Sequence, residues 1–392
     1  MKAKSILFLI FILFNAIESV SAQPNPFSDD GLSIALQKSK SEKKPVLLFL
    51  YAEWCAHCNK MKKEVFTNPE VVNSITKNFV ATAVDAEKGE GVLLKKKYSA
   101  TAYPSFVVLD ADGKTLYGFV GELTAEAFLS EAKTALIPER QLPYLEQQFN
   151  NDFSNADKCY AYITTLKKAN IDVSAVTKKY LQTQTEKQLV TETNWRIIAN
   201  GVSEIDSREF QYVLKNQQAF AKVSSPKRVE RKIVHTVSEL LRPFTNNLDT
   251  IGYYKNRPLA KSVGLHKTDS LIFTYDLLLS ERTKNWKMYA KSAEESVGLY
   301  YANDPEKLKE TALVYLKNIT ENAALQQAIK WTEQSVSLKP AADGYLLAAK
   351  LYYKINDLKK SREFAAKSKS FSESLGFSTK EVDDFLSESK MN

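Results

Sequence analysis

The chain has 392 residues, of which 44% are hydrophobic and 26% are charged. This length exceeds one compact domain of ordinary size, so we expect two or more domains, and the composition excludes a largely disordered chain. The formal net charge of +8 comes from 54 basic and 46 acidic residues that are interleaved along the sequence. Because no dense basic block or nucleic-acid motif accompanies this mild excess, we expect no nucleic-acid partner.

Residues 1–22 have the pattern of a signal peptide. Lys2 and Lys4 precede an apolar run at residues 6–14, and residues 20–22 (Val-Ser-Ala) are small residues of the kind that signal peptidase accepts. The apolar run is shorter than the roughly 20 residues that span a bilayer. We therefore expect an exported, periplasmic protein that has no stable membrane insertion after cleavage of the signal peptide.

From about residue 28 to residue 136, amphipathic segments alternate with continuous apolar ones. The expected order begins with a helix from residue 32, a buried strand at 46–51, a helix through residue 65 and a helix opened by Asn68-Pro69. A strand at 79–84 and a helix at 91–98 follow. Strands at 105–109 and 116–119, joined by an Asp112-Gly113 turn, and a closing helix at 124–136 complete the order. This order predicts an α/β domain over residues 23–137, with a mainly parallel sheet, an antiparallel edge and helices on both faces.

Beyond residue 137 the strand-like segments stop, and helical periodicity with proline punctuation continues to the C-terminus. We expect residues 138–392 to be all-α, with a possible break near residue 320 and with helices at 324–338, 341–355 and 358–370. Residues 324–372 resemble tetratricopeptide repeats in the spacing of certain residues, which are Ala328, Ser335, Pro340, Ala349, Tyr352, Asn356, Ser361 and Ala365.

Two of the three cysteines, Cys55 and Cys58, lie three positions apart directly after the expected strand at 46–51. At the N-terminus of a helix, free backbone N–H groups and the helix dipole favour a thiolate, so Cys55 is the expected nucleophile. Cys58 lies one turn further along and would resolve the mixed disulfide that forms between Cys55 and a substrate. The pattern predicts a redox-active disulfide, with a purely structural disulfide as the alternative.

Other residues near the cysteine pair have expected roles of their own. His57 would favour the thiolates and make the disulfide form more oxidising, with an exposed spectator as the alternative. Lys60, Lys62 and Lys63 are expected on a solvated face of the same helix. Cys159, in a helical stretch, is expected to be a small buried residue. No metal or other cofactor is expected, because zinc takes about four ligands and the chain offers one cysteine pair and three histidines.

Residues 46–121 resemble the thioredoxin superfamily. The segment 52–58 (AEWCAHC) matches its active-site loop, and 102–106 (AYPSF) matches the loop that carries its cis-proline. Within the superfamily, the segment 51–66, followed by 68–71 (NPEV), is most similar to the periplasmic C-terminal domain of the thiol:disulfide interchange protein DsbD and to related exported bacterial thioredoxins. The resemblance implies that Pro104 is cis and packs against the cysteines, that Tyr103 offers backbone hydrogen bonds to an extended substrate, and that Trp54 covers the site.

One position departs from the thioredoxin pattern. The superfamily usually carries a buried aspartate six positions before the first cysteine, as the proton acceptor for the resolving thiol, and this chain has Phe49 there. Glu53 is the nearest carboxylate and the candidate substitute, with a plain exposed glutamate as the alternative. The missing acid predicts slow resolution by Cys58 unless another group assists it.

Two functions are consistent with these patterns. The first is an exported thiol-disulfide oxidoreductase, a protein disulfide reductase or isomerase, that acts on exported proteins with disulfides or thiols and binds a substrate or partner through its helical region. Reduction would need an electron donor, for which the resemblance implies a membrane protein. The alternative is a non-enzymatic helical scaffold or redox-sensing binding module with a thioredoxin-like peptide groove, because the helical region carries no catalytic constellation.

Overall fold

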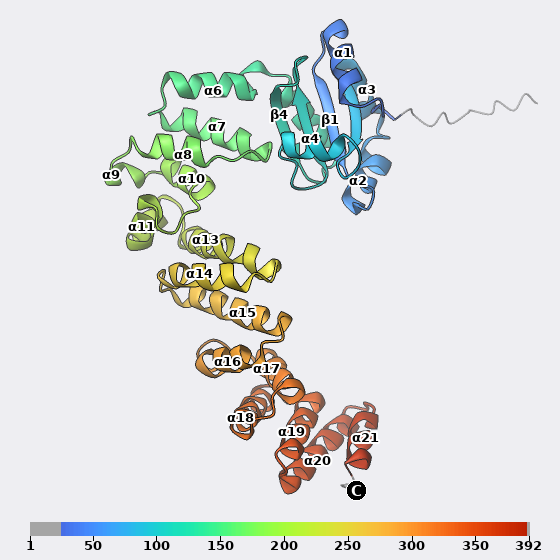
Figure 1. Cartoon of the computed structure of the whole chain (residues 1–392), viewed down its shortest axis with the longest axis vertical. Coiled ribbons are helices and arrows are strands. Elements are labelled where there is room, and N and C mark those ends of the chain that lie inside the picture. The colour runs from blue at the N-terminus through green and yellow to red at the C-terminus, as the bar shows by residue number, and fades with distance from the viewer. Residues whose placement is uncertain (1–24, 390–392) are drawn as a thin grey trace, which may run out of the picture. The chain divides into compact units, whose positions relative to one another are not determined.

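The computed structural model describes residues 25–389, so the expected signal peptide lies outside the described residues. The chain divides into two compact units, of which the first runs through Leu189 and includes residues 196–201, and the second takes residues 190–195 and everything from Val202. Figure 1 labels many of the helices and strands of both units. Among the described helices, none combines the length and the apolar character needed to cross a membrane.

The first unit begins with a sheet and the helices that cover it, which confirms the predicted α/β domain (Figure 1). Its elements are α1 Leu32–Glu42, β1 Val46–Tyr51, α2 Ala56–Lys60, the π-helical turn η1 Met61–Val65, α3 Pro69–Asn78, β2 Val80–Asp85, α4 Gly91–Lys97, β3 Ser105–Leu109, β4 Thr115–Val120, α5 Ala125–Ala135 and the 3-10 turn η2 Pro138–Arg140.

The strand order is β2-β1-β3-β4, and it corrects one prediction. β1 is parallel to β2, but β3 is antiparallel to both β1 and β4, so the prediction of a mainly parallel sheet is wrong. The cause is the connection through α4, which leaves the chain at the end of the sheet where β1 finishes. Ser105 at the start of β3 therefore pairs with Leu50 near the end of β1. A parallel strand would need a connection that returns to the opposite end.

The turn between β3 and β4 confirms the predicted hairpin. Asp110 accepts hydrogen bonds from the backbone N–H groups of Asp112 at 3.0 Å and Lys114 at 2.8 Å. Gly113 has a φ of 80°, a left-handed conformation that glycine adopts without strain. The local sequence therefore sets this turn.

β1 is buried on both of its faces. Leu47 and Phe49 point into a core that also contains Cys58 and residues of η1, α3 and α5. Leu48 and Leu50 point into the opposite core, which α1 and α4 cover. Alternate side chains of a strand face opposite sides of the sheet, so two covered faces account for the continuous apolar sequence.

The first compact unit extends past the expected boundary at residue 137, because α6 and α7 pack against β4. Gly118 on β4 permits this approach, since a Cβ atom there would lie 2.8 Å from the Cβ atom of Ala169. Asn170 donates a hydrogen bond to the carbonyl oxygen of Ser99 at 2.6 Å. The helices of this unit are α6 Leu142–Asn151, α7 Ala156–Lys168, α8 Ser174–Leu181, α9 Glu186–Leu189 and part of α10 Glu192–Gly201.

The described part of the second unit is helical, as predicted. Its further helices are α11 Arg208–Lys215, α12 Gln217–Val223, α13 Pro226–Asn246, α14 Thr250–Lys261, α15 His266–Arg282, α16 Trp286–Tyr300, α17 Pro305–Asn318, α18 Asn322–Leu338, α19 Ala342–Lys354, α20 Leu358–Ser374 and α21 Lys380–Glu388. Helices α18 to α20 lie where the sequence predicted them. Ser361 joins α20 to α19 through a hydrogen bond of 2.8 Å to the carbonyl oxygen of Ala349. The tetratricopeptide resemblance stays a prediction.

A buried ion pair joins α14 to α15 in this unit. Arg257 donates to both carboxylate oxygens of Asp276, at 2.8 and 2.6 Å, and the hydroxyl of Tyr253 donates to the same carboxylate at 2.8 Å. Asp276 and Tyr253 are buried. The fork-to-fork geometry compensates for the loss of water around the carboxylate.

Candidate functional site

Cys55 is the N-cap residue of α2, just after the turn that leaves β1. Its N–H donates to the carbonyl oxygen of Ala52 at 3.1 Å, and its sulfur accepts the N–H of Cys58 at 3.2 Å. A cap side chain meets the free N–H groups of the first helical turn, and these favour an anionic acceptor. The two cysteines therefore lie in the expected strand-to-helix turn, with a backbone donor directed at the Cys55 sulfur.

Both thiols of the pair are free, and little of either residue is exposed: 4% of Cys55 and 0% of Cys58. Burial, assisted by a hydrogen bond to Cys55, raises the pKa of the Cys58 thiol to about 12. Cys58 is therefore protonated at neutral pH. It must lose its proton before it can attack a mixed disulfide, because only the thiolate is nucleophilic.

His57 is tied to a carboxylate that the sequence did not single out. Its Nδ1 atom lies 2.5 Å from one oxygen of Glu122, and Lys60 Nζ lies 2.6 Å from the other. Hydrogen bonds from Lys60 and His57 hold the pKa of Glu122 below its usual value. Glu122 follows Gly121 at the end of β4, more than 60 residues from His57, and no local pattern announces such a contact. The Glu122 carboxylate offsets part of the positive charge expected beside the thiolates.

Glu53, the candidate replacement for the missing acid, is directed to the surface. Its carboxylate lies 2.6 Å from Lys88 Nζ, and its side chain is 67% exposed. Phe49 is 1% exposed and stacks on Phe106 with ring centroids 5.1 Å apart. The position of the usual acid is thus filled by aromatic packing.

The prediction of a solvated face at Lys60, Lys62 and Lys63 is wrong for Lys62. Its Nζ atom lies 3.3 Å from the centroid of the Tyr51 ring, and its side chain is half-buried, whereas Lys63 is exposed. The cause is the short π-helical turn after α2, which directs Lys62 over the end of β1. Aromatic faces attract cations, so this contact holds the ammonium beside the core.

Trp54, Tyr103 and Pro104 form a rim beside the cysteine turn, in which Trp54 is exposed, Tyr103 is half-buried and Pro104 is buried. The Tyr103–Pro104 peptide bond is cis, as the resemblance implied. Trp54 is 71% exposed, meets the Tyr103 ring edge-on at 6.1 Å between centroids, and donates from Nε1 to Glu87 at 2.7 Å. The carbonyl oxygen of Pro104 accepts a hydrogen bond from the N–H of Gly121 at 2.8 Å. An exposed aromatic residue on this rim leaves apolar surface for a bound chain.

Cys159 differs from the pair in its surroundings. It lies in α7 with 0% exposure, and burial alone raises the pKa of its thiol to about 12. The prediction of a buried small residue is confirmed. Among residues 25–389, no cluster of three or more His, Cys, Asp or Glu side chains has the arrangement of a metal site.

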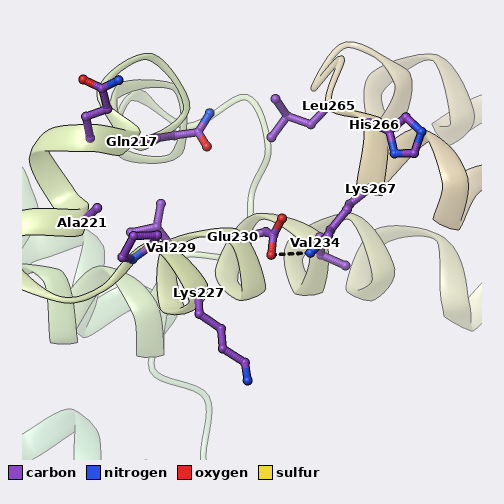
Figure 2. Close-up of a pocket in the computed structure, with 11 residues that line it drawn as sticks. Gln217, Ala221, Lys227, Val229, Glu230, Val234, Leu265, His266 and Lys267 are labelled. Atoms are coloured by element: carbon purple, nitrogen blue, oxygen red, sulfur yellow. Dashed lines mark hydrogen bonds and ion pairs between the residues drawn. The ribbon is translucent and has the colours of Figure 1, made fainter.

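A cavity of about 710 Å³ lies in the second unit, between α12, α13 and the start of α15 (Figure 2). Its lining is mostly apolar, and an ion pair of 2.6 Å between Glu230 and Lys267 borders it. Among the described residues, no Ser, Thr or Cys side chain lines it. The cavity therefore offers a binding surface.

Comparison with known proteins concerns the first domain. A model of the thioredoxin-like domain matches residues 32–136. The chain is 36% identical over 100 residues to the thiol:disulfide interchange protein DsbD of Pectobacterium atrosepticum, covering 25% of this chain and 17% of that protein. It is 31% identical over 108 residues to DsbD of Escherichia coli, covering 26% of this chain and 19% of that protein.

A similar solved structure covers the same region. The C-terminal domain of Neisseria meningitidis DsbD in its oxidised form is 27% identical, with 26% of this chain and 90% of that chain covered and a TM-score of 0.24. The chain spans less than a fifth of the length of the two DsbD relatives. The N-terminal α/β domain is thus thioredoxin-like, and its Cys-x-x-Cys segment is similar to thiol:disulfide interchange proteins of the DsbD type.

Proposed function

We propose that this protein is an exported thiol-disulfide oxidoreductase, a protein disulfide reductase or isomerase, that acts on other exported proteins through Cys55 and Cys58. The observation that carries this proposal is the hydrogen-bonded pair itself. Cys55 caps a helix with a backbone donor on its sulfur, and the Cys58 thiol lies within reach of the same sulfur. The similarity of this domain to DsbD supports the same chemistry.

Cys55 and Cys58 would carry the two thiol-disulfide steps of the proposed exchange. In the reductive direction, the Cys55 thiolate attacks one sulfur of a substrate disulfide, the substrate S–S bond breaks, and its other sulfur leaves and takes up a proton. Cys58 then loses its proton and attacks Cys55, which forms the Cys55–Cys58 disulfide and releases the second substrate sulfur as a thiol. Two electrons pass to the substrate, so a donor must reduce the disulfide again. A membrane protein is the proposed donor.

The rim residues have proposed roles in binding. The Tyr103–Pro104 segment would hold an extended substrate by backbone hydrogen bonds, and Trp54 would cover the reacting sulfurs. His57 would tune the redox potential together with Glu122. Glu53 could serve as a base for Cys58 only after it leaves Lys88.

The test of this proposal is an exchange assay with a disulfide-bonded protein and a dithiol donor. We expect the wild type to accelerate exchange and Cys55→Ser to abolish the acceleration. Equal rates for the two proteins would refute the enzyme proposal. The potential of the pair against glutathione then sets the direction: a value near that of thioredoxin, about −270 mV, supports reduction, and a much higher value supports isomerisation or oxidation.

A binding module is the second candidate, and the cavity between α12, α13 and α15 favours it. In that case the helical region binds a partner, and the cysteine pair only reports the redox state. Cells that carry Cys55→Ser separate the two proposals. An unchanged phenotype with retained partner binding supports the module, whereas the phenotype of a complete deletion supports the enzyme.

A further inference from the structure

Lys62 lies one turn after the resolving cysteine. Cys58 lies four residues before Lys62, so the two side chains share one face of the helix formed by α2 and η1. Lys62 Nζ lies 3.3 Å from the centroid of Tyr51 and 5.8 Å from that of Phe49. The ammonium is thus held over the carboxyl end of β1, on the side of the sheet whose core contains Cys58.

A cavity of about 280 Å³ opens beside this ammonium. Lys62, Tyr51 and Phe49 line one part of it, and Asn25 and Asp29 from the segment before α1 line another. The lining is partly polar and has room for water. Water in this cavity would lie against the Lys62 side chain.

The titratable groups around Lys62 are Cys58, Asp29, Asp85 and Glu53. Burial lowers the pKa of Lys62 from its ordinary value, against the opposing pull of these acids. Conversely, the Lys62 charge acts to lower the pKa of Cys58, against the burial that raises it to about 12. The ammonium and the thiol therefore interact, and the interaction favours the thiolate.

We propose that Lys62 is a positioning residue whose ammonium stabilises the Cys58 thiolate while that thiolate resolves mixed disulfides. This inference rests on the proposed exchange function and deepens it. Phe49 provides no acid to draw off the Cys58 proton, and the nearby lysine instead stabilises the charge that remains after the proton has left. The attraction is screened less than it would be in water, because both groups are partly buried.

The step balances without any further reactant. Cys58 releases its proton to water, and its thiolate attacks the Cys55 sulfur of the mixed disulfide. The Cys55–Cys58 bond forms as the bond between Cys55 and the substrate breaks. The substrate sulfur leaves with the electron pair of that bond and takes up a proton from water, while Lys62 keeps its own proton throughout.

Release of glutathione from a Cys55–glutathione mixed disulfide measures this step directly. The full-length mature protein is compared with Lys62→Met, Lys62→Gln and Lys62→Arg, and with Lys63→Met as the matched control on the exposed neighbour. Acid-quenched samples are followed by intact mass between about pH 6 and pH 11. Alkylation of Cys55 by iodoacetamide and circular dichroism check the nucleophile and the fold.

We expect release at pH 7 to be about tenfold slower in both uncharged variants, the effect of about one pKa unit in Cys58. Lys62→Arg and Lys63→Met should stay within about twofold of the wild type. Because Lys62 loses its charge as the pH rises past its lowered pKa, the difference should vanish toward pH 11.

Two results would overturn the inference alone: uncharged variants that release glutathione at the wild-type rate, or variants that are slowed equally at every pH, which indicates a packing defect. A wild-type adduct that never releases glutathione would overturn the proposed function as well.

Discussion

The cysteine domain and the helical region bury polar groups in contrasting ways. In the helical region, the carboxylate of Asp276 is met by Arg257 and Tyr253, so both of its oxygens have partners. In the cysteine domain, Cys58 is equally inaccessible, but its neighbours are a second thiol and an ammonium. A compensated charge stabilises a structure, whereas a protonated thiol beside a second thiol can react once it loses its proton.

The two buried thiols, Cys58 and Cys159, differ in their neighbours. Cys58 and Cys159 are each 0% exposed, and in each the pKa is raised to about 12. At Cys159 burial is the whole cause, whereas at Cys58 the Cys55 sulfur and Lys62 also act. Burial alone therefore gives an inert thiol, and the neighbours give reactivity.

Removing each of these thiols should produce the largest difference. In Cys58→Ala, a mixed disulfide on Cys55 has no resolving thiol, so we expect its lifetime to rise by about a thousandfold or more. In Cys159→Ala, the lifetime should stay within about twofold of the wild type. Intact mass over time measures both. Comparable lifetimes in the two variants would contradict the proposal that Cys58 resolves the mixed disulfide and Cys159 does not.

The pH dependence should follow the proton on Cys58. Its pKa lies above the ordinary value of 9.0, so the reactive thiolate is a small fraction that grows with pH. Release of glutathione from Cys55 should therefore rise about tenfold per pH unit between about pH 6 and pH 8.5. A plateau below pH 9 in quenched-flow measurements would show that burial does not hold the proton.

The ion pair of the helical region should matter for stability and not for exchange. Arg257→Met leaves Asp276 buried without its partner, and we expect the free energy of unfolding to fall by about 3 kcal/mol. Lys255→Met, on an exposed residue of the same helix, should change it by less than about 0.5 kcal/mol. Urea denaturation measures both. A fall in thiol exchange by the folded Arg257→Met protein would contradict the division of roles.

The smallest effect is expected at Glu122. Glu122→Gln removes the carboxylate shared by His57 and Lys60, so the Lys60 charge acts more fully on the neighbouring thiolate. The equilibrium with glutathione should move toward the dithiol by about threefold, because these groups are exposed and screened by salt. Glu126→Gln, at an exposed carboxylate of α5, is the control. A shift toward the disulfide would contradict the interpretation that positive charge beside the thiolates favours the dithiol.

Local patterns predicted much of the cysteine domain. The apolar run at 46–51 and the strand at 105–109 have the predicted bounds, and the turn at Gly113 follows from its residues. Each of these features depends on neighbours in the sequence. The cysteine turn was predictable for the same reason, since a strand followed at once by a helix fixes the N-cap.

The features that sequence patterns did not predict depend on contacts between segments that are distant in the chain. The direction of β3 is set by its pairing with β1, and Glu122 reaches His57 from the far end of the hairpin. Lys62 looked like one of three solvated lysines, and only the rings of Tyr51 and Phe49 distinguish it. Periodicity cannot predict such contacts, because it describes one element at a time.

The central claim is that Cys55 and Cys58 cycle between a dithiol and their own disulfide. Peptide mapping of the protein after stoichiometric reaction with a disulfide substrate tests it most directly. We predict that the protein loses the mass of two hydrogen atoms, that the peptide containing both Cys55 and Cys58 carries an internal disulfide, and that Cys159 remains a free thiol. A stable substrate adduct, or a disulfide that includes Cys159, would contradict the account.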